Sequence, residues 1–126
     1  MKLIIGIVVL IMAINGFAFY NLHRTINHSE EIIDTLEILR KIIDQEDWKK
    51  TPEVIQELEK KWEQADAWWT PLMDHREIDL LEQTIVRVVQ NIEVRQKQEA
   101  LVEIALAKRM TKKIMEKEQP YLKNIF

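Results

Sequence analysis

The chain has 126 residues, of which 47% are hydrophobic and 31% charged, and its formal net charge is −3. This composition excludes a disordered chain, and the length fits a single domain. The two glycines, Gly6 and Gly16, lie in the apolar N-terminal segment, and cysteine is absent. These counts exclude a glycine-rich phosphate loop, disulfides, zinc–thiolate sites and thiol nucleophiles.

Residues 3–20 form an apolar segment without a single charge. As a helix, the segment would extend about 27 Å, which matches the hydrocarbon core of a bilayer. We therefore predict a transmembrane anchor over residues 1–20 that contacts membrane lipid. The predicted anchor residues are Leu3, Ile4, Ile5, Ile7, Val8, Val9, Leu10, Ile11, Phe17, Phe19 and Tyr20.

Two other interpretations of this segment stay open. It is also compatible with a cleaved signal peptide, with Gly16-Phe17-Ala18 as the small-x-small site, or with the core helix of a soluble protein. We favour an uncleaved anchor, because the charged region of a signal peptide would be Met1-Lys2 alone and the apolar run continues to its end without a polar break.

The charges around the segment predict its orientation. Lys2 precedes it, whereas Arg24 is soon followed by Glu30 and Glu31. Because positive charge favours the cytoplasmic side, we expect the N-terminus in the cytoplasm. Residues 21–126 would then lie on the extracytoplasmic side of the cell membrane.

Beyond the anchor, apolar residues recur at helical spacings of three and four. Four helices are predicted, over residues 21–45, 51–70, 74–92 and 97–117, and the first continues directly from the anchor. Thr51 is expected to cap the second helix and Pro120 to end the fourth. The predicted fold is all-α, with an N-terminal transmembrane helix followed by a small antiparallel bundle of about four helices over residues 21–126.

The four tryptophans divide into two groups. Trp48, Trp62 and Trp69 share the apolar stripe of the second helix, so we expect them to fill the core. Trp68 lies off that stripe. An exposed Trp68, with Trp48 near the turn, would stack on a sugar or grip a partner; the alternative is burial of Trp68 against the C-terminal tail.

A histidine with nearby acids opens the third predicted helix. His75 and Asp79 are four residues apart and share a helix face, with Glu77 between them. Such a set is able to hold a metal or orient an imidazole, but the second histidine of a zinc H-E-x-x-H motif is missing. We favour helix capping and solvated charge, and predict no metal site.

Charge is unevenly distributed along the chain. Residues 30–79 carry 15 acidic and seven basic side chains, whereas residues 80–126 carry six and nine. We expect the acidic and basic helices to pack side by side. The alternative is a basic segment that seeks anionic lipid or nucleic acid, carried by Lys108, Arg109, Lys112, Lys113 and Lys117. No aromatic residues interleave with these cations, so we predict no nucleic-acid partner.

These residues together resemble the bacterial domain-of-unknown-function family 4363. The resemblance covers nearly the whole chain and rests on several short motifs: Glu46-Asp47-Trp48, Leu58-Glu59-Lys60-Lys61-Trp62, Trp69, His75-x-Glu77-Ile78-Asp79 and Leu122-Lys123-Asn124-Ile125-Phe126. The fourth helix departs from the family pattern at residues 108–113. The resemblance implies an anchored helical protein from a firmicute-like bacterium and no assigned activity. It also singles out His75 and the Asn124-Ile125-Phe126 ending.

We therefore expect a membrane-tethered interaction module that binds another membrane or envelope protein. A homo-oligomer stays open. The alternative is a ligand- or metal-binding module that uses the Trp48, Trp68 and His75 region. We expect neither enzymatic activity nor a cofactor. The candidate partner- or ligand-binding residues are Trp68, Trp48, His75, Glu77, Asp79, Asn124 and Phe126.

Overall fold

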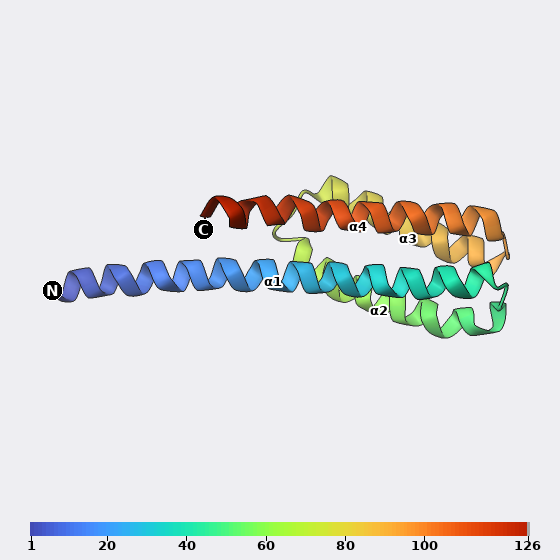
Figure 1. Ribbon diagram of the computed structural model, residues 1–126, viewed down its shortest axis with the longest axis horizontal. Coiled ribbons are helices and arrows are strands. Elements are labelled where there is room, and N and C mark those ends of the chain that lie inside the picture. Colours follow the sequence, from blue (N-terminus) through green and yellow to red (C-terminus); the bar gives the residue numbers. More distant parts are fainter. Residues whose placement is uncertain (126) are drawn as a thin grey trace.

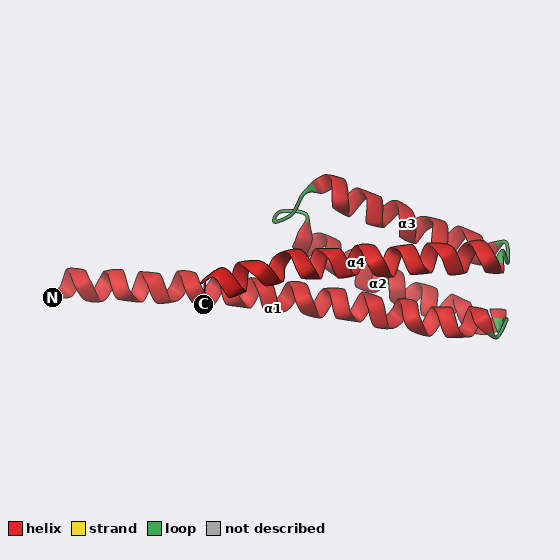
Figure 2. Cartoon of the chain, turned by 45° about the horizontal axis from the view of Figure 1, so that its top comes forward, coloured by secondary structure: helices red, strands yellow, loops and turns green. Residues whose placement is uncertain are grey.

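The computed structural model describes the backbone of residues 1–125 and the side chains of residues 1–117. Within residues 1–125 all regular secondary structure is helical and no strand is present, which confirms the all-α prediction (Figures 1 and 2). The elements are α1 (Lys2–Asp44), the short 3-10 helix η1 (Trp48–Lys50), α2 (Thr51–Trp69), α3 (His75–Glu93) and α4 (Lys97–Ile125).

Helix α1 is one uninterrupted helix of 43 residues, as predicted for the junction of the apolar segment with the first bundle helix. Its N-terminal part projects from the bundle, and residues 1–20 are all exposed (Figure 1). The first buried side chain along α1 is that of Thr25. The N-terminal end of α1 is therefore an exposed apolar segment, and its C-terminal end is one of the packed helices of the bundle.

The four helices form an up-and-down bundle in which consecutive helices run antiparallel (Figure 2). Helix α1 packs against both α2 and α4, and α3 packs against α4. In contrast, α2 and α3 make few contacts with each other although they are neighbours in the chain. One side of the bundle is thus held together much more loosely than the other three.

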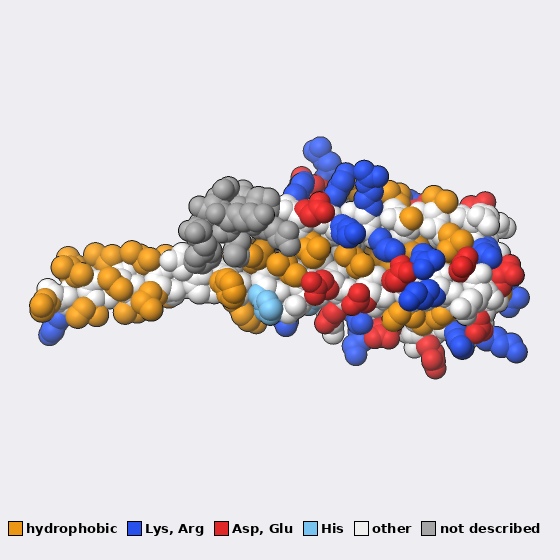
Figure 3. Space-filling view, viewed as in Figure 1, with side chains coloured by type: hydrophobic (Ala, Val, Ile, Leu, Met, Phe, Trp, Pro, Cys, Tyr) orange, Lys and Arg blue, Asp and Glu red, His pale blue; other side chains and the backbone are white. Residues whose placement is uncertain are grey.

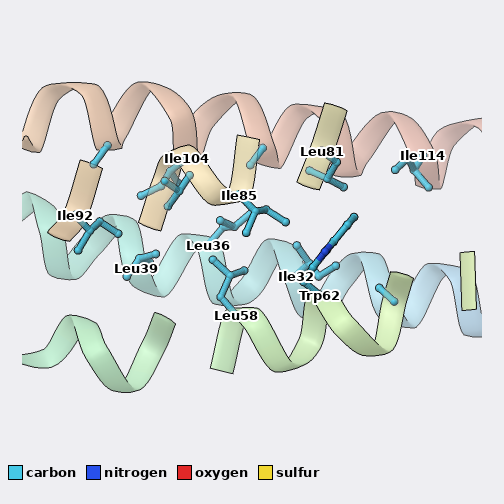
Figure 4. Packing of buried hydrophobic residues seen from close by; sticks show 14 of the residues in the cluster. Ile32, Leu36, Leu39, Leu58, Trp62, Leu81, Ile85, Ile92, Ile104 and Ile114 are labelled. Carbon is cyan, nitrogen blue, oxygen red and sulfur yellow. The ribbon is translucent and has the colours of Figure 1, made fainter. Parts of the chain in front are cut away.

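The core is built from the apolar stripes that the sequence predicts. Helix α1 contributes Ile32, Leu36, Leu39 and Ile43, all of them fully buried. Side chains from the other three helices meet them along the bundle axis, and Figure 4 shows this interlocking (Leu58, Trp62, Leu81, Ile85, Ile92, Ile104 and Ile114). Each fully buried aliphatic side chain of this kind stabilises the fold by about 1.5–3 kcal/mol.

An ion pair joins α1 to the basic helix α4. Lys108 Nζ on α4 lies 2.5 Å from the Glu37 carboxylate on α1, which also accepts a hydrogen bond from Arg40 Nη2 at 2.6 Å. These hydrogen bonds from Arg40 and Lys108 lower the pKa of Glu37 to about 2. Arg87 of α3 and Glu103 of α4 add a second inter-helix pair, 3.2 Å apart.

Two predicted helix ends are wrong. Thr51 does not cap α2 from outside: it lies inside the first turn, is buried, and its hydroxyl donates a hydrogen bond to the Trp48 carbonyl at 2.7 Å. Pro120 does not end α4, because the helix runs on to Ile125. A proline already has a helical φ and lacks one backbone N–H, so its presence weakens a helix without always stopping it.

Helices α1 and α3 end in the same backbone motif. After α1, Glu46 N–H donates to the Ile43 carbonyl and Asp47 N–H to the Ile42 carbonyl; after α3, the equivalent bonds start at Arg95 and Gln96. This is the Schellman ending, in which one residue adopts a left-handed conformation. Glu46 and Arg95 hold that position with a φ of 57° each, without a glycine.

Replacing Glu46 or Arg95 with glycine is expected to stabilise the bundle. A side chain at positive φ costs on the order of 1 kcal/mol, which glycine avoids. The midpoint of thermal unfolding, followed by circular dichroism of the full chain in detergent, should therefore rise. Gln45→Gly is the matched control, because Gln45 has a φ of −83° and gains nothing from glycine. Equal behaviour of all three variants would contradict this explanation.

Candidate functional site

The structure separates the residues of the alternative ligand site. Trp48 precedes α2 and Trp68 lies near its end, so the two are about 30 Å apart along the helix axis. His75 begins α3 at the Trp68 end and is exposed. The structure therefore does not bring Trp48, Trp68 and His75 together in a single site.

The acidic residues around His75 serve the start of α3. Asp74 is the N-cap, and its carboxylate accepts a hydrogen bond from Arg76 N–H at 3.0 Å. Glu77 pairs with Lys117 of α4, and Asp79 is exposed. Within the part of the chain that the structure describes, no three histidine or carboxylate side chains gather as a metal site would require.

Two further candidates lie where no side chain is described. The backbone of Asn124 belongs to α4, and Phe126 lies outside the described residues.

Trp68 packs against α1. Its ring meets Tyr20 edge to face at 6.0 Å between centroids, and the Arg24 guanidinium lies 5.6 Å from the ring centroid. His28 follows one turn further, 6.4 Å from Trp68. A cavity of about 550 Å³ lies here, lined by Arg24, His28 and Trp68 together with Glu31, Gln64 and Ala67. The aromatic cluster fastens the end of α2 to α1 just beyond the apolar segment.

A groove runs between α2 and α3, where the bundle is loosely closed. Two adjoining hollows of about 460 and 440 Å³ make up this α2–α3 groove and share Glu59 and Glu93. Its apolar lining consists of Trp48, Pro52, Ile55, Trp62, Ile85, Val86, Val89 and Ile92. Trp62 and Ile85 also belong to the core, so the groove reaches down to the core itself.

One comparison with known proteins gives a match. The model of the family described as a domain of unknown function, DUF4363, matches residues 19–125. The chain belongs to this family. Searches of curated proteins and of solved structures find no match.

Acidic side chains border the groove of this DUF4363 chain on both sides. Glu59, Glu63 and Asp66 come from α2, and Glu82 and Glu93 from α3. Arg95, at the end furthest from the apolar segment, is the one cation among the lining residues. Carboxylates of like charge thus line both borders of the groove, between two helices that make few contacts with each other.

The charge distribution along the sequence did not reveal that acidic residues of α2 and α3 in this DUF4363 chain line the same groove. The buried polar residues of α1 were not predicted either. Thr25, His28 and Ser29 are buried, although they are polar and close to the apolar segment. Their spacing is the sequence signal that could have revealed this burial. Thr25, His28 or Ser29, Ile32 and Leu36 recur with the period of one helix face.

His28 is expected to make the bundle sensitive to mild acid. Burial first, and then the Arg24 guanidinium, lower the pKa of His28 below its ordinary value of 6.5, whereas Glu31 opposes the shift. The unfolded chain therefore takes up this proton at a higher pH than the folded chain. Stability that is present above about pH 6.5 is lost as the pH falls through the lowered folded pKa.

Thermal unfolding of the full chain between pH 7.5 and 5.5 checks this expectation. The decrease in midpoint should be smaller for His28→Gln than for the unaltered chain. His75→Gln serves as the control, since His75 is exposed. The same decrease in all three proteins would rule out His28 as the responsible group.

Proposed function

We propose that this chain is a membrane-anchored helical interaction module. Its α2–α3 groove binds one amphipathic helix with a basic face, carried by a neighbouring membrane or envelope protein. The observation that supports this proposal is the groove itself, which combines an apolar floor with acidic borders.

The exposed apolar end of α1 supports the anchor. An 18-residue window of this helix has a mean hydropathy of 2.4 and is not buried at all within the described fold. Large apolar side chains cover every side of it, as Figure 3 shows for one face. In water this surface would be costly, since each square ångström of apolar area contributes roughly 25 cal/mol when buried. A bilayer covers it over the length that the helix provides.

We further propose that the bundle lies on the extracytoplasmic side, because the positive charge of Lys2 precedes the apolar segment. The chain has no cysteine, so a single Val86→Cys variant carries a unique label site. A membrane-impermeant maleimide added to intact cells is expected to label it. Labelling only after the cells are opened would reverse the orientation.

The lining of the groove fits one helix of a partner. An amphipathic helix that docks in a groove inserts apolar side chains at spacings of three and four and leaves its polar face outside. Acidic borders favour lysine and arginine beside those apolar side chains and speed the encounter. Both partners would be confined to one membrane, and this raises their effective concentration so that a modest interface suffices.

A photo-reactive amino acid at Val86 tests the groove in native membranes. Val86 lines the groove and is 47% exposed, so a partner helix would lie within reach. Irradiation should give one discrete cross-linked product. Adding Glu63→Lys and Asp66→Lys should remove that product, because two acidic residues on the α2 border of the groove then carry positive charge.

Ile38 provides the matched control. It is 52% exposed and lies on α1, away from the groove lining. The same photo-reactive residue at Ile38 should give no such product. Equal products from Val86 and Ile38, or a Val86 product that survives the charge reversal, would contradict the proposed site.

A further inference from the structure

We infer that the helix received by the α2–α3 groove is α4 of a second copy of this chain. The inference rests on the proposed function and names its partner. Helix α4 carries a solvent-facing stripe of the chemistry that the groove requires. This stripe, called the α4 stripe below, consists of Val102, Ala105, Leu106, Arg109, Lys112 and Lys113.

The α4 stripe lies on the side of α4 that its own bundle does not use. The buried residues of α4 are Ala100, Ile104, Ala107, Thr111 and Ile114. At 100° per residue, Arg109 and Val102 point nearly opposite to that buried face. Val102 is 66% exposed and Leu106 38%, which is unusual for aliphatic side chains side by side on one helix face. The stripe therefore cannot reach the groove of its own chain.

The α4 stripe and the groove have the same order of apolar and charged residues. From the end furthest from the apolar segment, α4 presents Val102 and Leu106 first and its cations afterwards. Figure 3 shows lysine and arginine side chains gathered over α4. Beyond Glu93 and Arg95 at that end, the groove presents apolar residues such as Ile55 and Val89, and it reaches Glu59, Glu63 and Asp66 later.

The heights along the bundle also agree. The first residues of α2 and α4 lie at the same end of the bundle, and Lys97 Nζ bonds the Asp44 carbonyl at 3.1 Å there (Figure 1). Asp66 is fifteen residues after Thr51, and Lys112 is fifteen residues after Lys97. At 1.5 Å per residue both lie about 22 Å from that end.

Anchoring in the same membrane would fix how two copies are aligned along the bundle axis. Two copies anchored by the same apolar segment stand at the same height and in the same direction. Arg109, about 18 Å from the far end, is then level with Glu82 at about 16 Å and with Glu63 at about 18 Å. No shift along the bundle axis is needed for opposite charges to meet.

The contact would be heterologous, because the groove of one copy receives the α4 stripe of the next. After one contact, one copy keeps a free stripe and the other keeps a free groove, so association continues in the membrane plane as a row or closes as a ring. A symmetric pair, with groove on groove, would bring five carboxylates of each copy together and is excluded by repulsion.

Single-cysteine variants of the full chain in lipid vesicles test this arrangement. Val86→Cys marks the groove and Leu106→Cys marks the α4 stripe. A mixture of the two should yield a cross-linked heterodimer with a short bis-maleimide, well above the homodimers of either alone. Ile38→Cys mixed with Leu106→Cys is the control and should yield none.

Charge reversal gives the sharper test. The groove variant Glu63→Lys with Asp66→Lys, or the stripe variant Arg109→Glu with Lys113→Glu, should each lower the cross-link about tenfold. When the two variants are mixed, one intact groove and one intact stripe remain. The cross-link should return with Leu106→Cys on the groove variant and Val86→Cys on the stripe variant, because that pair combines an intact stripe with an intact groove. Circular dichroism confirms that both variants are folded.

The outcomes separate this inference from the proposed function. A heterodimer that is absent, or that ignores charge reversal, overturns the α4 partner. If photo-reactive Val86 in native membranes then still gives a charge-dependent product with a different protein, the groove remains a docking site for another basic helix. If that product is absent too, both proposals fail. A photo-reactive amino acid in place of Leu106 gives one more test. A lipid adduct as its main product would show that the α4 stripe faces the membrane, and it would also overturn the inference.

Discussion

The structure depends on the continuity of α1. A single helix supplies the apolar rod, then the aromatic cluster with Trp68, and then a core wall of Ile32, Leu36 and Leu39. The other helices pack on this wall directly or through α4. Because no glycine or proline interrupts α1 after Gly16, the bundle has no flexible joint at its base.

The loose side of the bundle places like charges beside apolar packing. Trp62 of α2 and Ile85 of α3 belong to the core and line the groove, and carboxylates from both helices line its borders. By contrast, opposite charges pair between α1 and α4 (Glu37 and Lys108) and between α3 and α4 (Arg87 and Glu103). A lysine in the groove would neutralise part of the negative charge there and would be expected in a sequence selected for stability alone. The excess of acidic residues is therefore consistent with the proposed binding of a partner.

The helices were predictable because their apolar residues keep one period, and the turns because polar residues interrupt it. Two helix ends were not, since Thr51 and Pro120 have side chains that fit inside a helix as well as at its limit. The position of Trp68 against Tyr20 and Arg24 depends on how α2 leans on α1, which no local pattern encodes. The groove could not be predicted from the sequence either, because it forms between the faces of two helices, α2 and α3.

Because α1 is unbroken, the bundle and the apolar segment tilt together. Residues 21–44 extend about 36 Å beyond the apolar segment, at 1.5 Å per residue. Transmembrane helices change their tilt to match the thickness of the bilayer. A change in tilt of about 10° would swing the far end of the bundle sideways by about 6 Å, since nothing at its base absorbs the rotation. With the apolar segment as the proposed membrane anchor, a change in bilayer thickness would therefore move the far end of the bundle sideways.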